Sequence, residues 1–205
     1  MIVIVDYGLG NLGSILNMLK KIGAEARISS DVSVIEKADK LILPGVGAFD
    51  NGMRNINDLG LLGVLEQKAL KENVPVLGIC LGMQLLTAKS EEGERPGLGW
   101  VEAKTVRFKF DDDSSKGLKV PHMGWNNICR VKNNPLFSGE NDERFYFVHS
   151  YHVVCHDKEN VISLTKYGYD FVSGFQKDNI YGVQFHPEKS HKYGMRLLRN
   201  FAELC

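Results

Sequence analysis

The sequence predicts an α/β fold with a parallel sheet and crossover helices, followed by a region of different β structure. In the first half of the chain, short apolar runs typical of strands buried on both faces alternate with segments whose apolar residues recur at helical spacing. Such alternation indicates a parallel sheet whose strands are joined by helices. The second half instead contains several short strand-like runs with few helices between them.

The first half is predicted to supply three strands and three helices. Strands are predicted at the apolar runs of residues 2–5, 41–43 and 76–79. Helices are predicted over residues 12–22, 59–73 and 82–89. The first helix is followed by Gly23, a residue type that readily forms the left-handed cap of a helix end. Because ligands of parallel sheets bind at the carboxyl ends of the strands, the segments after these strands are candidates for function.

The second half is predicted to supply mainly strands, with one helix closing the chain. The strands are predicted over residues 101–110, 126–131, 145–149, 161–165 and 180–185, and the final helix over residues 190–204. The polar run of residues 111–117 is interpreted as a solvated hairpin tip rather than as a metal site. Since no repeat, low-complexity tract or linker separates the halves, residues 1–205 are expected to form a single domain.

Composition and charge disfavour several classes of function. The 25 basic and 25 acidic residues cancel, so the chain lacks the basic excess typical of nucleic-acid-binding proteins. No apolar run reaches the roughly 18 residues of a membrane span, and residues 1–6 do not form a secretory signal. The four cysteines match neither a CxxC pair nor a zinc pattern, so we expect free thiols in the cytoplasm and no metal or cofactor.

The segment around Cys80 is the most informative one for chemistry. An apolar strand runs into the pattern Gly78-x-Cys80-x-Gly82 and then into a predicted helix, which is the cysteine counterpart of a nucleophile elbow. Such a turn would place the thiol at a helix N-terminus, where the dipole favours a thiolate. The N–H of Leu81 would point at a developing oxyanion. A buried structural cysteine, with glycines that allow close packing, is the alternative.

A base and its orienting partner stand near the end of the chain. His186 and Glu188 follow the predicted strand of residues 180–185, so they also lie at a strand end. In an extended segment, residues two apart share a face, which would let Glu188 reach one imidazole nitrogen while the other faces the thiol. A surface turn is the alternative for this segment alone. The occurrence of both motifs at strand ends favours a triad of Cys80, His186 and Glu188.

Two glycine-containing loops follow other strands. In residues 44–47, the glycines on either side of Val46 would let backbone N–H groups point into the site, and a plain turn is the alternative. A phosphate-binding loop is disfavoured because the GxxxxGK[ST] pattern is absent. A GxGxxG pattern over residues 8–13 matches a dinucleotide-binding fingerprint, but no acidic residue closes a following strand about twenty residues later.

Together these motifs resemble the class I, or triad-type, glutamine amidotransferases. The resemblance covers nearly the whole chain and rests on a Pro-Gly-Val-Gly strand end, a Gly-Ile-Cys-Leu-Gly-x-Gln elbow and a late His-Pro-Glu. Four segments further resemble the glutaminase subunits of imidazole glycerol phosphate synthase: residues 6–11, 44–49, 121–126 and 145–151. The resemblance implies a flavodoxin-like three-layer sandwich, with a mostly parallel sheet, helices on both faces and an antiparallel β extension.

The resemblance also implies roles for individual residues in hydrolysing L-glutamine to glutamate and ammonia. Cys80 would attack the substrate carboxamide, His186 would transfer protons, and Glu188 would orient His186. The oxyanion would be held by backbone groups of Val46, Gly47 and Leu81, and the positions that hold glutamine correspond to Gln84, Ser150 and Tyr151. For Gln84, an ordinary polar position in the first turn of a helix is the alternative.

A partner is implied because ammonia must reach a synthase without entering bulk water, where it is mostly protonated near neutral pH. By resemblance the partner is a (β/α)₈-barrel cyclase subunit, which would form a heterodimer with this chain and release imidazole glycerol phosphate and AICAR in histidine biosynthesis. The positions beside the ammonia exit correspond to Asn11, Trp125, Tyr146 and Lys189. For Trp125 and Tyr146, core packing is the alternative.

Three other interpretations stay open at the level of sequence. The long hairpin region of residues 108–119 and the extra thiol of Cys155 leave open a paralogue that supplies ammonia to amidotransferases of surface-polysaccharide sugars. A stand-alone cysteine hydrolase could use the same triad. A flavodoxin-like binding module could carry Cys80 incidentally. The order and spacing of the motifs favour the glutaminase of histidine synthesis.

Overall fold

The computed structural model describes residues 1–110, 117–139 and 144–205, and in these ranges the largest sheet has 11 strands. Five of them run parallel, in the order β2 (Ala26–Ser29), β1 (Ile2–Val5), β3 (Lys40–Leu43), β4 (Val76–Ile79) and β13 (Ile180–Val183). The strands β1, β4 and β13 are buried along their whole length, as expected for short apolar strands covered on both faces. The parallel sheet predicted from the sequence is confirmed.

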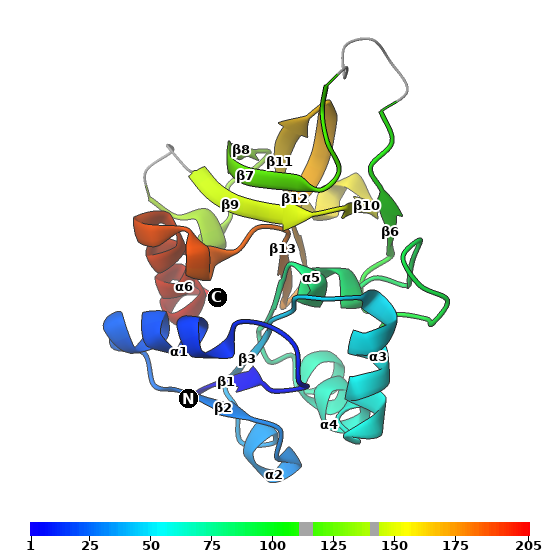
Figure 1. The fold of residues 1–205 in the computed structure, drawn as a ribbon. Coiled ribbons are helices and arrows are strands. Elements are labelled where there is room, and N and C mark those ends of the chain that lie inside the picture. Colours follow the sequence, from blue (N-terminus) through cyan, green and yellow to red (C-terminus); the bar gives the residue numbers. More distant parts are fainter. Residues whose placement is uncertain (111–116, 140–143) are drawn as a thin grey trace.

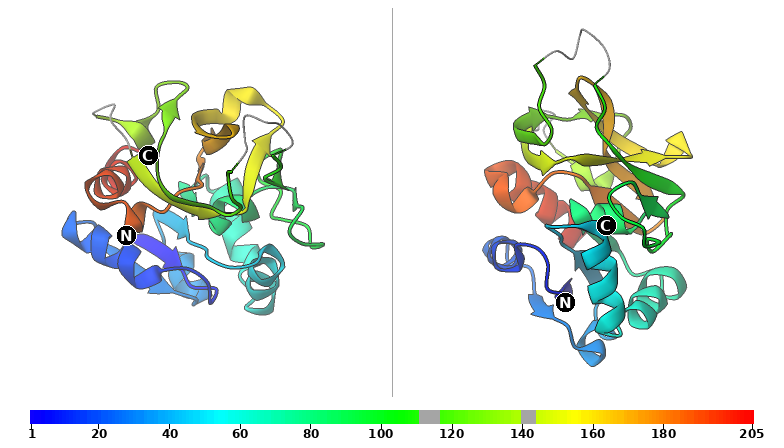
Figure 2. Two further views of the ribbon diagram at one scale, coloured as in Figure 1. Left: turned by 45° about the horizontal axis from the view of Figure 1, so that its top comes forward. Right: turned by 45° about the vertical axis from the view of Figure 1, so that its right-hand side comes forward.

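Helices cover both faces of the parallel strands (Figures 1 and 2). The helices on one face are α1 (Leu12–Lys21) and α6 (His191–Leu204), and those on the other are α3 (Phe49–Asp58), α4 (Leu62–Glu66) and α5 (Leu81–Leu85). Alternate residues of β1 contribute to separate cores, Val3 with Phe49 on one face and Ile4 with Leu198 on the other. The predicted three-layer arrangement is confirmed.

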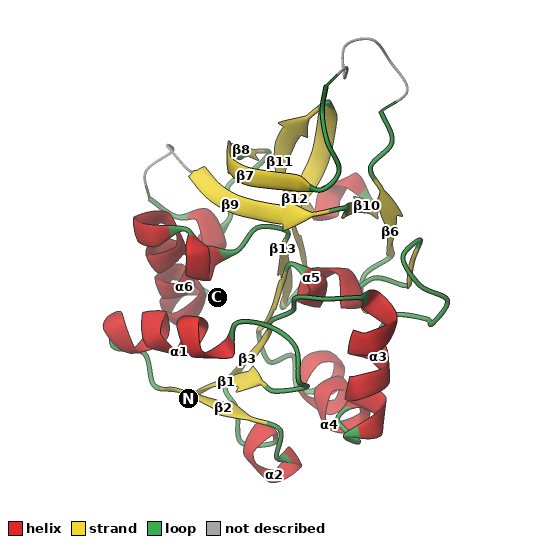
Figure 3. Cartoon of the chain, viewed as in Figure 1, coloured by secondary structure: helices red, strands yellow, loops and turns green. Residues whose placement is uncertain are grey.

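An antiparallel extension continues the sheet beyond β13 (Figure 3). It contains β12 (Tyr169–Lys177), β10 (Tyr151–Cys155) and β6 (Ala103–Arg107), with β11 (Val161–Tyr167) paired to β12 and β8 (Cys129–Arg130) paired to β11. The two-residue strand β5 (Lys89–Ser90) pairs with β6 in parallel at the edge of the sheet. A separate pair is formed by β7 (His122–Asn127) and β9 (Arg144–His149). The antiparallel extension implied by the resemblance is confirmed. Among the described residues, no helix is both long and apolar enough to cross a membrane.

Several predicted boundaries are wrong, each for a local reason. The helix predicted over residues 59–73 begins at Leu62, because Gly60 has a φ of 67° and separates α3 from α4, and it continues as a π-helical turn over Gln67–Lys71. The helix predicted over residues 82–89 ends at Leu85, because Lys89–Ser90 pairs with β6. The strand predicted over residues 126–131 divides between β7 and β8, which pair with β9 and β11.

Some elements escaped prediction because polar residues interrupt their apolar pattern. In α3 the buried residues Phe49, Met53 and Ile56 follow helical spacing, but asparagine, aspartate and glycine stand between them. In β12 the buried side chains include Ser173 between Phe171 and Phe175, which weakens the alternation. The strands β2 and β10 and the single helical turn α2 (Val32–Ile35) were also not predicted. Residues 111–116 of the predicted hairpin tip lie outside the described residues.

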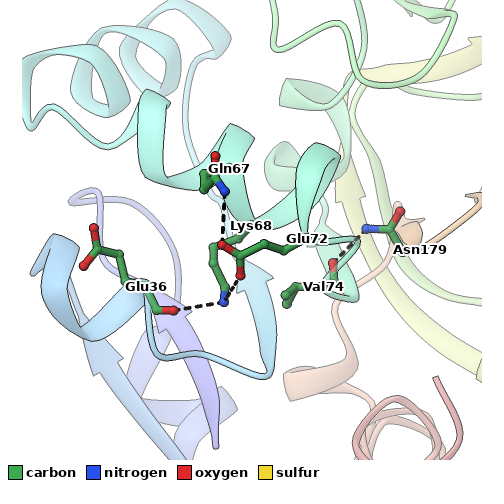
Figure 4. A network of polar contacts seen from close by, with 6 residues as sticks. All are labelled: Glu36, Gln67, Lys68, Glu72, Val74 and Asn179. Carbon is green, nitrogen blue, oxygen red and sulfur yellow. Dashed lines mark hydrogen bonds and ion pairs between the residues drawn. The ribbon is translucent and has the colours of Figure 1, made fainter.

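A polar network fixes the amino ends of the central strands (Figure 4). The buried Lys68 ammonium donates to the carbonyl of Glu36 at 2.9 Å and to the Glu72 carboxylate at 2.6 Å. The Asn179 amide, which precedes β13, donates to the carbonyls of Ala69 and Val74 before β4, each at 2.8 Å. These contacts hold the ends of β4 and β13 in register, and the residues that follow the two strands meet at the opposite edge.

Candidate active site

Cys80 occupies a strained turn between β4 and α5. Its φ of 54° and ψ of −109° lie where residues other than glycine are rarely found, as in a nucleophile elbow. The turn is held by a hydrogen bond of 2.8 Å from the Cys80 N–H to the Val183 carbonyl. A Cβ atom on Gly82 would lie 1.8 Å from the Leu43 carbonyl oxygen, so α5 can approach the end of β3 only with glycine there.

His186 and Glu188 lie together at the end of β13. The His186 Nδ1 atom and the Glu188 Oε1 atom are 2.8 Å apart, and both side chains are almost completely buried. The expected contact is present, but residues 187–189 form a 3₁₀ turn rather than an extended segment. The backbone of His186 is fixed by a hydrogen bond of 2.9 Å from its N–H to the Tyr146 carbonyl. The buried His186 Nε2 atom has no hydrogen-bond partner in the described residues, so it can act on a substrate.

Opposite charges control the protonation of His186. Burial alone would lower its pKa, but the negative charges of the Cys80 sulfur and the Glu188 carboxylate outweigh burial and raise the pKa to about 10. An imidazolium beside the sulfur stabilises the thiolate form of cysteine, which is the nucleophilic form. The same imidazolium can donate its proton to a leaving group. A cysteine sulfur beside a protonated histidine is the arrangement that nucleophilic catalysis by cysteine uses.

A pocket of about 250 Å³ joins Cys80 and His186 to the other predicted residues. It is lined by Val46, Gly47, Cys80, Leu81, Gln84, Glu92, Pro121, Val148, His149, Ser150, Tyr151 and His186. The predicted oxyanion and glutamine-binding residues all belong to this lining, and Glu188 lies behind His186. The volume is below the roughly 300–1,000 Å³ of pockets for drug-sized ligands, so it suits a molecule as small as an amino acid.

The loop of residues 44–47 is anchored on one side and open on the other. The buried Tyr7 hydroxyl donates a hydrogen bond to the Pro44 carbonyl. A Cβ atom on Gly45 would lie 2.6 Å from the Leu81 Cβ atom, so the loop packs tightly against the start of α5. Val46 is exposed at the pocket, and Gly47 has a φ of 127°, a conformation that favours glycine.

Two buried glutamines connect the nucleophile to the wall of the pocket. The Gln84 Nε2 atom donates to the Tyr151 carbonyl and to the Gln184 Oε1 atom, each at 3.1 Å. The Gln184 Nε2 atom lies 3.7 Å from the Cys80 sulfur. Gln84 is thus buried in the site rather than exposed on a helix surface. The sequence did not single out Gln184, although it stands two residues before His186.

A pair of neutral histidines supports the segment of Ser150 and Tyr151. The His149 Nδ1 atom lies 2.8 Å from the Tyr151 carbonyl, and its Nε2 atom lies 3.0 Å from the Nδ1 atom of His122. Burial lowers the pKa of His122 to about 4, and burial likewise lowers the pKa of His149. Both rings are therefore neutral near pH 7 and can form this chain of hydrogen bonds. Spacing in the sequence gave no sign of it, because the two residues lie on different strands.

Three of the four residues predicted for a partner face lie together at the surface. Trp125, on β7, is 39% exposed, and its ring contacts that of Tyr146 edge to face, with the Lys189 ammonium 5.7 Å from the Tyr146 ring. Trp125 also stacks on His191, which the sequence did not single out. The alternative that Trp125 packs in the core is therefore wrong. Asn11 is exposed at the start of α1, a helix that contacts the Pro187–Lys189 turn.

Glu92 is a further pocket residue that the sequence did not single out. Its carboxylate accepts a hydrogen bond of 2.9 Å from the Phe49 N–H at the start of α3 and stands at the edge of the pocket. A carboxylate in this position can attract the ammonium group of an amino acid. Glu92 did not stand out in the sequence, because three of the four residues 91–94 are acidic and such segments are commonly solvent-exposed.

Comparisons with known proteins agree with this geometry. A family model described as glutamine amidotransferase class-I matches residues 3–204. The chain is 56% identical over 202 residues to imidazole glycerol phosphate synthase subunit HisH 2 of Methanococcus maripaludis, covering 98% of each chain. It is 51% identical over 205 residues to the protein of the same name in Pseudomonas aeruginosa, covering 100% of each. A solved glutamine amidotransferase with 22% identity has the same fold, with a TM-score of 0.72 over 98% of this chain and 97% of the other. The chain belongs to the class I glutamine amidotransferase family.

Proposed function

We propose that this chain is the glutaminase subunit of imidazole glycerol phosphate synthase and that residues 1–205 act as one amidotransferase domain. The observation that carries the proposal is the site itself: a cysteine on a strained turn shares a small pocket with a buried, carboxylate-bound histidine. The Methanococcus and Pseudomonas relatives, which match the chain over almost its whole length, supply the identity of the synthase.

The first half of the reaction forms a thioester. The Cys80 thiolate attacks the side-chain carbonyl carbon of glutamine, a carbon–sulfur bond forms, and the carbonyl electrons move to oxygen. The N–H of Leu81 and the backbone of Val46 and Gly47 stabilise this oxyanion. The oxyanion then collapses, the carbon–nitrogen bond breaks, and His186 donates its proton so that ammonia leaves. The raised pKa of His186, about 10, supports its role as the acid.

The second half of the reaction releases glutamate. Neutral His186 removes a proton from water, which attacks the thioester carbonyl, and collapse of this second oxyanion breaks the carbon–sulfur bond and restores the thiolate. Glu188 accepts the Nδ1 proton in a hydrogen bond and keeps the Nε2 atom directed at the reacting groups. Gln84, Ser150 and Tyr151 hold the substrate, and Glu92 at the edge of the pocket attracts its ammonium group.

The partner we propose is a (β/α)₈-barrel cyclase subunit that forms a heterodimer with this chain in the cytoplasm. Its docking face on this chain includes Asn11, Trp125, Tyr146 and Lys189. Trp125 and Met123, which is 61% exposed, project from the same strand and give this face an apolar centre. Aromatic residues surrounded by polar ones are typical of protein interfaces. Ammonia would be released close to this face, because the His186 backbone pairs with that of Tyr146.

The test is co-purification with a cyclase subunit followed by a glutaminase assay. The chain and the cyclase subunit are produced together, and glutamate formation is measured with the chain alone, with the complex, and with the complex plus the cyclase substrate. We expect a stable 1:1 complex, low activity of the chain alone and strong activation by the cyclase substrate. Full activity of the isolated chain, or no complex, would contradict the proposal.

A genetic test separates histidine synthesis from the paralogue that serves surface polysaccharides. The Methanococcus and Pseudomonas relatives carry the numeral 2 in their names, so this distinction is worth a direct test. The chain is expressed with the cyclase subunit in a strain that lacks its own glutaminase subunit, and growth without histidine is scored at low ammonium concentration. We expect growth. Failure to grow, with glutaminase activity intact in the extract, would favour the paralogue.

A further inference from the structure

We propose that Gln184 is a catalytic residue whose side-chain amide donates a hydrogen bond to the Cys80 sulfur and joins that sulfur to the substrate-binding Gln84. The inference rests on the proposed glutaminase function and adds a fourth side chain to the three of the triad. Gln184 touches the reacting sulfur itself, at 3.7 Å between its Nε2 atom and Sγ. It is fully buried.

The sheet places Gln184 beside the nucleophile. The strands β4 and β13 are adjacent and parallel, and Val183 pairs with Ile79, so the next residues along the two strands are Gln184 and Cys80. The Cys80 N–H is bonded to the Val183 carbonyl at 2.8 Å, and the Gln184 N–H to the Ser173 carbonyl at 3.0 Å. Both backbones are therefore fixed, and the amide reaches the sulfur from a rigid strand end rather than from a mobile loop.

Hydrogen bonding determines which way the two amides point. The Tyr151 carbonyl can only accept, so the group of Gln84 that faces it, at 3.1 Å, is the NH₂. The same NH₂ faces the Gln184 amide at 3.1 Å, so the Gln184 group there is the oxygen. The remaining NH₂ of Gln184 must then face Cys80. The Tyr151 carbonyl at one end of this series of hydrogen bonds thus requires that a hydrogen-bond donor face the Cys80 sulfur at the other end.

A donor on the sulfur favours the thiolate. Hydrogen bonds to charged groups are stronger than those between neutral groups, and they strengthen further where water is absent. The Gln184 amide therefore stabilises the thiolate from the side of the sheet, independently of the imidazolium of His186. In the described residues no hydrogen bond is made to the Gln84 amide oxygen, which leaves this acceptor for the substrate. The hydrogen-bonded amides of Gln84 and Gln184 thus connect substrate binding to activation of the nucleophile.

The test measures the reactivity of Cys80 rather than glutamine hydrolysis. The rate of alkylation of Cys80 by iodoacetamide is followed by mass spectrometry of the Cys80 peptide as a function of pH, in the native chain and in Gln184→Met. Methionine has a similar size but lacks the N–H donor. We expect the pH midpoint of alkylation to rise by about one unit, the effect of losing one hydrogen bond to a charged group.

The matched control is Gln67→Met, which removes an exposed glutamine bonded at 3.2 Å to Glu72 (Figure 4). Neither Gln67 nor Glu72 lines the pocket. Its alkylation profile is expected to equal that of the native chain. An unchanged midpoint in Gln184→Met would overturn the role of Gln184. This outcome is distinct from failure of the proposed function, which would be absence of glutamine hydrolysis by the native complex.

A second measurement avoids the risk that Gln184→Met does not fold. The side-chain amide signals of Gln184 are followed by ¹H–¹⁵N NMR of the native chain during a pH titration, with Cys80→Ala as the comparison. A donor bonded to the sulfur must shift when the thiol ionises, and Cys80→Ala must abolish that shift. Identical Gln184 titration curves in the two proteins would contradict the hydrogen bond.

Discussion

The parallel strands and the antiparallel extension build opposite walls of the same pocket by different physical means. The parallel side positions Cys80 by backbone geometry: a left-handed φ of 54° and a contact that only glycine allows at Gly82. The extension positions Ser150 and Tyr151 by side-chain hydrogen bonds from His149 and His122. The reacting atom is thus held by strain and close packing, whereas the substrate wall is held by a polar network.

This difference predicts that the two walls of the pocket respond differently to amino-acid substitution. Close packing tolerates no added volume, since protein interiors are as dense as organic crystals. A hydrogen-bonded wall can lose one member and keep its shape, at the cost of an unpaired polar group. We therefore expect substitutions on the parallel side to abolish activity or folding, and those in the extension to weaken substrate binding. The expected effects decrease from the nucleophile to the substrate wall.

The largest effect is expected for Cys80→Ala. Without the sulfur no thioester can form, so glutamine hydrolysis by the complex should fall at least about a thousandfold, as when other catalytic nucleophiles are removed. The melting temperature should change little, because alanine is small and the backbone bonds of the turn remain. Glutamate release is measured by a coupled assay, with the exposed Cys129→Ala as the control. Activity within tenfold of the native rate would exclude Cys80 as the nucleophile.

Gly82→Ala should have the next largest effect, on the stability of the parallel side. The new Cβ atom would overlap the Leu43 carbonyl oxygen, which belongs to a buried strand and cannot move aside. The free energy of unfolding should fall by at least about 3 kcal/mol. Urea denaturation measures this loss. Gly63→Ala is the control, since a Cβ atom there meets nothing within 4 Å, and it should stabilise the chain by up to about 1 kcal/mol. Equal stability of the two variants would contradict the close-packing account.

His122→Phe tests the extension. Phenylalanine can keep the stacking of the His122 ring on Phe147 and Tyr167, but it removes the donor to His149. We expect a loss of about 1–3 kcal/mol in the free energy of unfolding, because a buried nitrogen of His149 is left without its partner. The KM for glutamine should rise by a larger factor than kcat falls. A fall in kcat without a change in KM would indicate that His122 supports the nucleophile rather than the substrate-binding wall.

The most gradual effect is the dependence of stability on pH. Burial lowers the pKa of His122 to about 4, below the value of about 6.5 in the unfolded chain, and it lowers the pKa values of His149 and His152 as well. As the pH falls from 6.5 towards 4, the unfolded state binds protons that the folded state does not. Stability should therefore fall by up to about 1.4 kcal/mol per pH unit for each histidine. Urea midpoints against pH measure this, and a slope unchanged in His122→Phe would contradict it.

The features that could be predicted from the sequence are those encoded by neighbouring residues. The strained turn at Cys80 follows from a strand and two glycines within five residues, and the contact of Glu188 with His186 needs only one intervening residue. The glutamine-binding residues required the family resemblance, since nothing in the spacing of Ser150 and Tyr151 points to Cys80. All of them line the pocket.

The features that could not be predicted depend on pairing between distant strands. The histidine pair forms because His122 and His149 are directly opposite in the β7–β9 register, and the glutamine pair forms because β4 and β13 are adjacent. Gln84 and Gln184 are 100 residues apart, so no local pattern relates them. The helix α5 was predicted too long because the end of a helix depends on the pairing of the next segment, here that of Lys89 with β6.

The most direct test of the central claim, that Cys80 is the nucleophile of a glutaminase, is labelling with a diazo-ketone analogue of glutamine. The complex with the cyclase subunit is incubated with the analogue, and the mass of the chain and of its cysteine-containing peptides is determined. We predict one covalent adduct per chain, located on Cys80, prevented by excess glutamine and absent from Cys80→Ala. The absence of an adduct on Cys80, or its presence on Cys129, Cys155 or Cys205 instead, would contradict the account.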